Sequence, residues 1–91
     1  MKKFKDFIVD LDGMHLVNTN NGLLYKFNFT DMIMTKITKQ SKANFPIRYD
    51  NNTQSILIWH QRRWQERADG IEMEAIIYMF NHSVEQQLLG E

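Results

Sequence analysis

The chain of 91 residues contains no cysteine, only one proline and only four glycines. Without cysteine it can form neither a disulfide nor a thiolate-ligated zinc site, and a chain that needs no disulfide is typical of a reducing compartment. We therefore expect a cytoplasmic protein. Asp6, Asp10 and Asp12 interrupt the apolar stretch that a secretory signal would need after the basic Met1–Lys5 segment, and no apolar run reaches membrane-spanning length. The sequence thus predicts no membrane partner.

A net charge is also lacking, because eleven Lys and Arg balance eleven Asp and Glu. A neutral chain does not resemble the strongly basic surface of a duplex-DNA-binding protein. The charges are nevertheless unevenly spread. Residues 1–48 carry eight basic and four acidic side chains, a charge of +4, whereas residues 49–91 carry three basic and seven acidic side chains, a charge of −4. Such a bipolar chain favours oriented docking and head-to-tail self-association.

Two glycine dipeptides predict β-hairpins in the first thirty residues. Asp12-Gly13 and Asn21-Gly22 are typical of two-residue turns in which both central residues have positive φ. Counting outward from these turns pairs Val9 with Leu16 and Leu16 with Phe27, which predicts a three-stranded meander. One face of the meander then collects the large apolar side chains Phe7, Val9, Leu11, Met14, Leu16, Leu23, Tyr25, Phe27 and Phe29.

The opposite face of the meander carries three further aliphatic side chains, Ile8, Val17 and Leu24, which the same register places side by side. They need cover from a second layer, either residues 45–60 or another copy of the chain. Because the two halves of the chain also have opposite charge, we expect a homodimer rather than a monomer.

The segment after the meander has two interpretations. Thr30 can cap a helix over residues 31–41, with Asp31 near its positive end and lysines toward its negative end. The alternative is a fourth strand, because Thr35, Ile37 and Thr38 are β-branched. We favour the helix because the cap and the order of charges agree.

A second hairpin and a second helix complete the predicted fold. Residues 45–49 and 56–59 alternate around a turn at Asn51-Asn52, with Pro46 at the start of the first strand. After Asp69-Gly70, apolar residues recur at helical spacing up to Gly90: Met73, Ile77, Phe80, Val84 and Leu88. The prediction is a single α+β domain over residues 1–91, with a mostly antiparallel sheet (a three-stranded meander plus a hairpin) and two helices in the order βββαββα.

The stretch Phe7-Ile8-Val9-Asp10-Leu11-Asp12-Gly13 resembles the first motif of the haloacid dehalogenase phosphatases. The resemblance implies that Asp10 would be the nucleophile and Asp12 the general acid. It covers seven residues, Met14 stands where the family has Thr, and neither the lysine nor the paired acidic motif of the family follows. An apolar strand that enters a hairpin produces the same pattern, and we interpret Asp12-Gly13 as a turn.

No other set of residues predicts catalysis. Asp10 faces His15 across the first hairpin, an arrangement that can orient a general base, but no nucleophile is placed with them. His60 and His82 lie on different elements, and no two histidines have the spacing of metal ligands. We predict a protein that is not an enzyme, with no catalytic, cofactor-binding or metal-binding residues.

The strongest functional segment is residues 59–67, which contains both tryptophans and three of the four arginines. Tryptophan and arginine dominate the energetics of protein interfaces, and they also suit single-stranded nucleic acid, where rings stack on bases and guanidinium groups meet phosphates. A purely structural role for this segment is the third interpretation. We predict that Arg62, Arg63, Trp64 and Arg67 bind the partner and that Trp59 serves the fold.

We therefore expect a small module that binds a protein, an inhibitor or regulator that docks on a larger molecular machine. Eight Asn, nine Ile and seven Lys indicate an AT-rich coding source, and with the small size this profile resembles accessory proteins of phages and mobile elements, including anti-CRISPR proteins. The alternatives are a regulator that binds nucleic acid through residues 59–67 and a subunit of a phage or cellular assembly.

Overall fold

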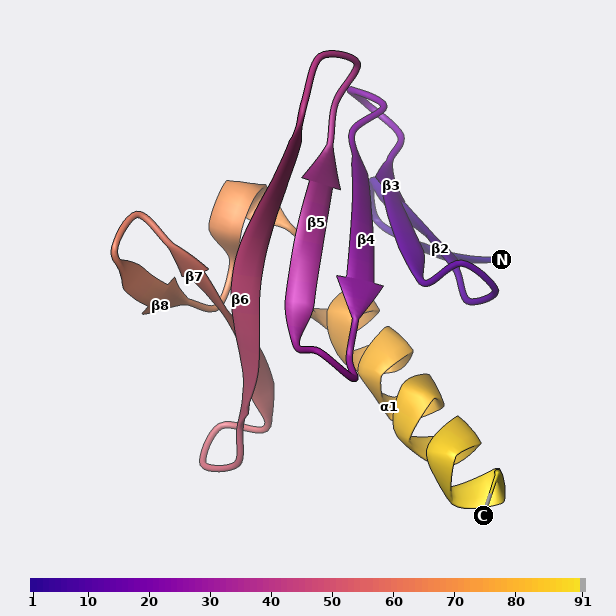
Figure 1. Cartoon of the computed structure of the whole chain (residues 1–91). Coiled ribbons are helices and arrows are strands. Elements are labelled where there is room, and N and C mark those ends of the chain that lie inside the picture. Colours follow the sequence, from indigo (N-terminus) through magenta and orange to yellow (C-terminus); the bar gives the residue numbers. More distant parts are fainter. Residues whose placement is uncertain (91) are drawn as a thin grey trace.

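The computed structural model describes residues 1–90, which form one antiparallel sheet of eight strands followed by a single α-helix (Figure 1). The strands lie in the sheet in chain order, so that each pairs with the strand before it and the strand after it. The strands are β1 (Lys2–Phe4), β2 (Phe7–Asp10), β3 (His15–Asn18), β4 (Leu24–Asn28), β5 (Ile33–Ile37), β6 (Lys42–Asp50), β7 (Ser55–His60) and β8 (Arg63–Gln65). A 3-10 turn, η1 (Ala68–Gly70), precedes helix α1 (Met73–Leu89).

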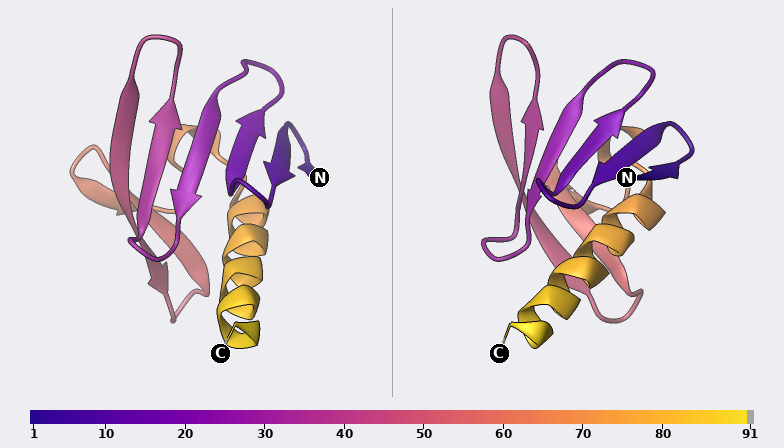
Figure 2. Two further views of the ribbon diagram at one scale, coloured as in Figure 1. Left: turned by 45° about the vertical axis from the view of Figure 1, so that its right-hand side comes forward. Right: turned by 90° about the vertical axis from the view of Figure 1, so that its right-hand side faces the viewer.

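The sheet curls around the first half of the helix. Helix α1 contacts both β2 and β7, although these strands are separated by four others in the sheet (Figure 2). The inner face of the sheet and the buried side of the helix form one apolar core: Phe7, Val9, Leu16, Tyr25, Phe27, Met34, Ile47, Ile56, Ile58, Ala68, Ile71, Ala75, Ile76 and Met79. All nine residues predicted for one face of the meander belong to this core or pack against it, which confirms the predicted face.

Most of the hairpin loops begin with the same local device. Strands β2, β3, β4 and β6 each end in Asp or Asn, and the side-chain oxygen of that residue accepts the backbone N–H two residues later, at 2.9–3.1 Å. This Asx turn satisfies a loop N–H that no strand can pair. In three of these hairpins the loop has four residues and its last residue has positive φ: Met14, Met32 and Gln54.

The predicted register is right for the first hairpin and shifted for the others. Val9 pairs with Leu16 as expected, but Leu16 pairs with Tyr25 rather than Phe27. The same shift of two residues separates the observed β6–β7 pairing, Ile47 with Ile58, from the pairing implied by a turn at Asn51-Asn52. Because side chains alternate with period two, a shift of two residues leaves every side chain on its predicted face.

The prediction of a helix over residues 31–41 is wrong, and with it the order βββαββα and the count of two helices. Residues Ile33–Ile37 form strand β5, which pairs with β4 on one side and with β6 on the other. Thr30 and Asp31 belong to the preceding hairpin loop, where the Asn28 Oδ1 atom accepts both of their backbone N–H groups at 3.0 and 2.9 Å. The β-branched residues in this segment favour a strand, because their side chains pack well in a strand that pairs on both sides.

Strand β6 changes partner at its centre. Its first half pairs with β5 as far as Pro46, and its second half pairs with β7 from Ile47 onward. Proline has no N–H to donate to a ladder, so a change of partner is a place in a strand where it can be accommodated. Pro46 therefore lies within β6 rather than at its start. Strands β1 and β8, at the two edges of the sheet, were not predicted as strands.

Helix α1 is confirmed, but its buried side differs from the predicted stripe. Ala75, Ile76 and Met79 are fully buried, whereas Val84 and Leu88 are exposed. Glu72, which precedes the helix, is buried and forms long ion pairs with Lys5 and Arg67. In the part of the chain that the structure describes, no helix has the length and apolar character needed to cross a membrane.

Candidate functional site

The structure does not bring the four predicted binding residues together. Arg62 is in the two-residue turn between β7 and β8, and Arg63 lies opposite His60, on the side of the sheet that faces the helix. Trp64 points to the outer side, because neighbouring residues in a strand face opposite ways. Arg67 lies beyond β8, and its guanidinium is 3.8 Å from the Glu72 carboxylate. The predicted cluster is therefore divided between the turn and the two faces of the sheet.

Trp64 instead meets two residues from other strands. Trp59 on β7 lies directly opposite it, and the two rings make an edge-to-face contact with their centroids 5.3 Å apart. The guanidinium carbon of Arg48, on β6, lies 4.7 Å from the centroid of the Trp64 ring, which is a cation–π contact. We call Arg48, Trp59 and Trp64 the tryptophan patch.

Strand alternation explains why these side chains share a face. Arg48 lies directly opposite Leu57, and Trp59 follows Leu57 two residues along β7. To reach Trp64 on β8, the Arg48 side chain must cross β7. Leu57, on the same side of the sheet, is only 9% exposed although the helix lies on the other side. The tryptophan patch therefore adjoins a buried apolar side chain, Leu57.

Arg48 is the residue of this site that sequence reasoning missed. Alternation in the second hairpin places Arg48, Leu57 and Trp59 on one face, but Arg48 lies outside residues 59–67, the segment in which binding residues were predicted. The useful signal was the period of two across β6 and β7, because residues distant in sequence become neighbours in a sheet.

The guanidinium of Arg48 is held in place and available to a partner. Arg48 is exposed, and within residues 1–90 none of the three ion pairs involves it. A guanidinium in a cation–π contact still carries N–H donors in its own plane, and these donors match the two oxygens of a carboxylate. Trp59, 39% exposed, adds an apolar surface next to these donors. The tryptophan patch can thus bind a carboxylate and an adjoining apolar group together.

The turn that joins β7 to β8 is strained. Gln61 and Arg62 have φ of 54° and 66°, the left-handed conformation at both central positions of a two-residue hairpin. Asn and Gly are the residues that this turn favours, since a side chain makes the left-handed region costly for most others. The strained turn sets the pairing that places Trp59 opposite Trp64.

The segment that resembles the phosphatase motif is a hairpin. Asp10 ends β2, its Oδ1 accepts the Asp12 backbone N–H at 3.1 Å, and the chain returns antiparallel at His15. The phosphatase family requires a parallel sheet around this motif, and β2 has antiparallel neighbours on both sides. Among residues 1–90, no three His, Asp or Glu side chains are grouped as metal ligands would be.

Comparisons of this chain with protein-family models, curated proteins and solved structures return no match.

Proposed function

We propose that this chain is a protein-binding module that docks on its partner through the tryptophan patch. The observation that carries the proposal is the cation–π contact of Arg48 with Trp64 beside the partly exposed Trp59. Tryptophan and arginine are the residues most enriched at interface hot spots, and an aromatic anchor held by neighbouring side chains loses little entropy on binding. The matching surface of the partner is an acidic side chain next to an apolar one.

A protein partner fits this geometry better than a single-stranded nucleic acid. Bases bind to proteins largely by stacking on open ring faces. In the tryptophan patch Arg48 occupies one face of Trp64, and Trp59 meets Trp64 edge-to-face. The zero net charge of the chain adds no general attraction for phosphate.

The biological role that we attach to this activity is inhibition or regulation of a larger machine. The proposal rests on the small size of the chain and on its resemblance in composition to phage accessory proteins, including anti-CRISPR proteins. A module of this size acts by occupying a surface on its target. We place it in the cytoplasm because the chain contains no cysteine.

The test is affinity purification from the native source with the wild-type chain and three variants as bait, followed by mass spectrometry. Arg48→Ala and Trp64→Ala remove the two halves of the cation–π contact, and Arg63→Ala is the matched control on the opposite face of the sheet. We expect wild type and Arg63→Ala to retain a protein, and this retention should persist after nuclease treatment. Both patch variants should fail to retain it. Retention that requires RNA or DNA, or a partner that all four chains bind equally, would contradict the proposal.

A further inference from the structure

Helix α1 continues past the sheet on which it packs. Its first half is buried, but in its last turns Val84, Leu88 and Leu89 are 37%, 67% and 80% exposed. Figures 1 and 2 show these turns running away from the strands toward the C-terminus. Helical turns without a packed face have little stability in water, so contact with a partner surface would stabilise the free end of α1.

The outer face of the sheet carries an unbroken aliphatic row. Ile8 pairs with Val17, Val17 with Leu24, and Leu24 with Ile37, so that one aliphatic side chain from each of β2 to β5 lies in line. All four side chains are partly exposed, and the helix packs on the opposite face of the sheet. Contiguous apolar surface of this kind marks an interaction site, in contrast to single exposed apolar residues. We call these four residues the aliphatic row.

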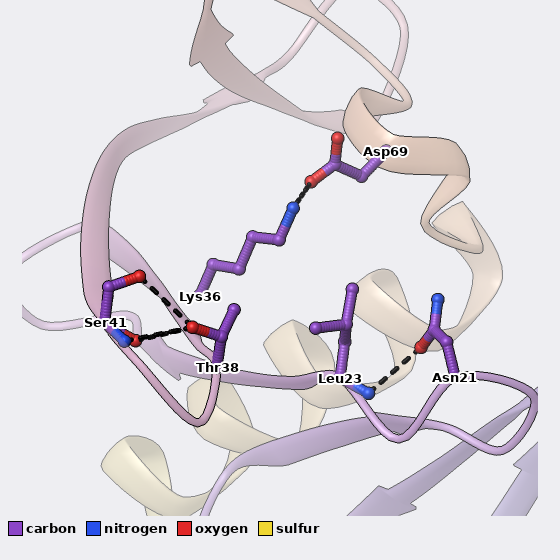
Figure 3. A network of polar contacts seen from close by, with 6 residues as sticks. All are labelled: Asn21, Leu23, Lys36, Thr38, Ser41 and Asp69. Atoms are coloured by element: carbon purple, nitrogen blue, oxygen red, sulfur yellow. Dashed lines mark hydrogen bonds and ion pairs between the residues drawn. The ribbon is translucent and has the colours of Figure 1, made fainter.

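The aliphatic row opens into a hollow at one end of the sheet. Leu24 and Ile37 line a hollow of about 460 Å³ together with residues 21–23 and 38–40. The two loops that form its walls include Leu23 and Thr38, which Figure 3 shows on neighbouring hairpin loops. The hollow therefore continues the row with space between two polar loops.

Charge distinguishes the row from the helix end. Lys3 pairs with Ile8 and Lys42 pairs with Ile37, so a lysine stands at each end of the aliphatic row, and Lys39 lines the hollow. Helix α1 contains glutamates but no lysine or arginine. The carboxyl end of a helix is also the negative end of its dipole. An apolar surface with a basic rim and an apolar helix end with acidic character thus occur in the same chain.

We propose that a second copy of this chain is the occupant of the aliphatic row, with the free end of its helix α1 seated on the row and in the hollow. Contact between two helix ends would bring acidic groups together, and contact between two rows would bring lysines together. The contact of helix end with row removes apolar surface from water on both sides and pairs opposite charges. It is heterologous, because it joins two different surfaces. This self-association goes beyond the proposed function and uses neither Arg48 nor the two tryptophans.

The test uses two complementary variants in light scattering and sedimentation. The tip variant, Leu88→Ser with Leu89→Ser, removes the exposed leucines, and Gln86→Ser with Gln87→Ser is its control on the same turns. The row variant, Val17→Glu with Leu24→Glu, places acidic groups in the row, and Thr35→Glu is its control on the neighbouring polar part of the same face. Circular dichroism and thermal unfolding establish that each chain is folded.

We expect wild type and both controls to associate with rising concentration and the tip and row variants to associate at least tenfold more weakly. Mixing the tip variant with the row variant should restore one intact contact and give a dimer with one copy of each. A wild type that stays monomeric, a tip or row variant that associates alone as strongly as wild type, or a mixture that does not associate would overturn the proposal. If the row variant fails to fold, wild-type association of the tip variant overturns the proposal and loss of that association supports it.

Discussion

Lys36 on β5 donates a hydrogen bond from its ammonium nitrogen to Asp69 Oδ2 at 2.6 Å, and this bond ties the middle of the sheet to the η1 turn (Figure 3). The hydrogen bond raises the pKa of Lys36 above its ordinary value of 10.5. Tyr25 lies on β4 opposite Lys36, and its pKa is raised above 10.0, mainly because the ring is buried and also by the charge of Asp69. Both groups hold their protons more tightly in the folded chain than in the unfolded one.

These two pKa shifts predict that the protein loses stability in alkaline solution. A raised pKa in the folded state contributes stability that is complete below the ordinary value and is lost as pH rises through the folded-state value. We therefore expect the midpoint of thermal unfolding to be level at neutral pH and to fall above about pH 10. Tyr25→Phe with Lys36→Met should make this fall shallower, whereas Lys39→Met, in an exposed loop, should not. Parallel curves for wild type and the double variant would refute the assignment.

The two glycines that predicted the hairpins occupy different environments. Gly22 has a φ of 74°, and no atom lies within 4 Å of the place that a Cβ would occupy. Gly13 does not have a left-handed φ. A Cβ there would lie 2.8 Å from the His15 ring, while Met14, the next residue, has the positive φ. The expectation that both glycines occupy left-handed turns is thus confirmed for Gly22 and wrong for Gly13.

Alanine substitutions should separate these two causes. Gly22→Ala should lower the free energy of unfolding by about 1 kcal/mol through backbone strain alone. Gly13→Ala should cost less, because the end of the His15 side chain can move away. In a chain that also carries His15→Ala, Gly13→Ala should no longer lower the free energy of unfolding through contact with the His15 ring. Gly22→Ala should cost the same free energy whether His15 is present or replaced by alanine. Urea unfolding of wild type, the three single variants and the two double variants measures both couplings, and equal couplings to His15 would contradict this explanation.

The faces of the first strands could be predicted from the sequence, but the register of the β3–β4 and β6–β7 hairpins could not. Alternation of apolar and polar residues in β2, β3 and β4 was enough to assign the faces, because the period of two survives a shift of two residues in register. The shift arises from the position of each turn. The pairing of Val17 with Leu24 centres one turn a residue before the predicted Asn21-Gly22, and the pairing of Asp50 with Ser55 centres the other a residue after the predicted Asn51-Asn52. The first hairpin also has a four-residue loop, but it is centred on Asp12-Gly13 and keeps the predicted register.

The remaining errors involve contacts that are distant in the sequence. Residues Ile33–Ile37 become a strand because β4 and β6 pair on both sides, and a local cap at Thr30 carries no information about those neighbours. The tryptophan patch depends on Arg48, eleven residues before Trp59, reaching across β7 to Trp64. The order of the strands in the sheet brings such residues together, and no single segment of the sequence determines that order.

Arg67 provides a prediction about stability at the start of helix α1. The Glu72 carboxylate is buried, and its two cationic neighbours are Arg67 at 3.8 Å and Lys5 at 3.5 Å. Removing one cation leaves a buried charge less compensated, although solvent around Arg67 reduces the effect. We expect Arg67→Ala to lower the free energy of unfolding by about 0.5–1 kcal/mol. Arg63→Ala, also an exposed arginine, should leave it unchanged, and equal unfolding curves for the two variants would show that the ion pair contributes nothing.

The strained turn between β7 and β8 allows stability to be raised without touching the tryptophan patch. Replacing Gln61 with Asn and Arg62 with Gly supplies the residues that favour two left-handed positions, and the free energy of unfolding should rise by about 1–2 kcal/mol. Arg63→Gly, one residue later and inside β8, is the control and should lower the stability, because glycine weakens a strand. The pairing of Trp59 with Trp64 is kept in the turn variant, so its affinity for the captured partner should match that of wild type. A loss of affinity in the stabilised variant would mean that Arg62 itself contacts the partner, as the sequence predicted, and would extend the binding site from the tryptophan patch to the turn.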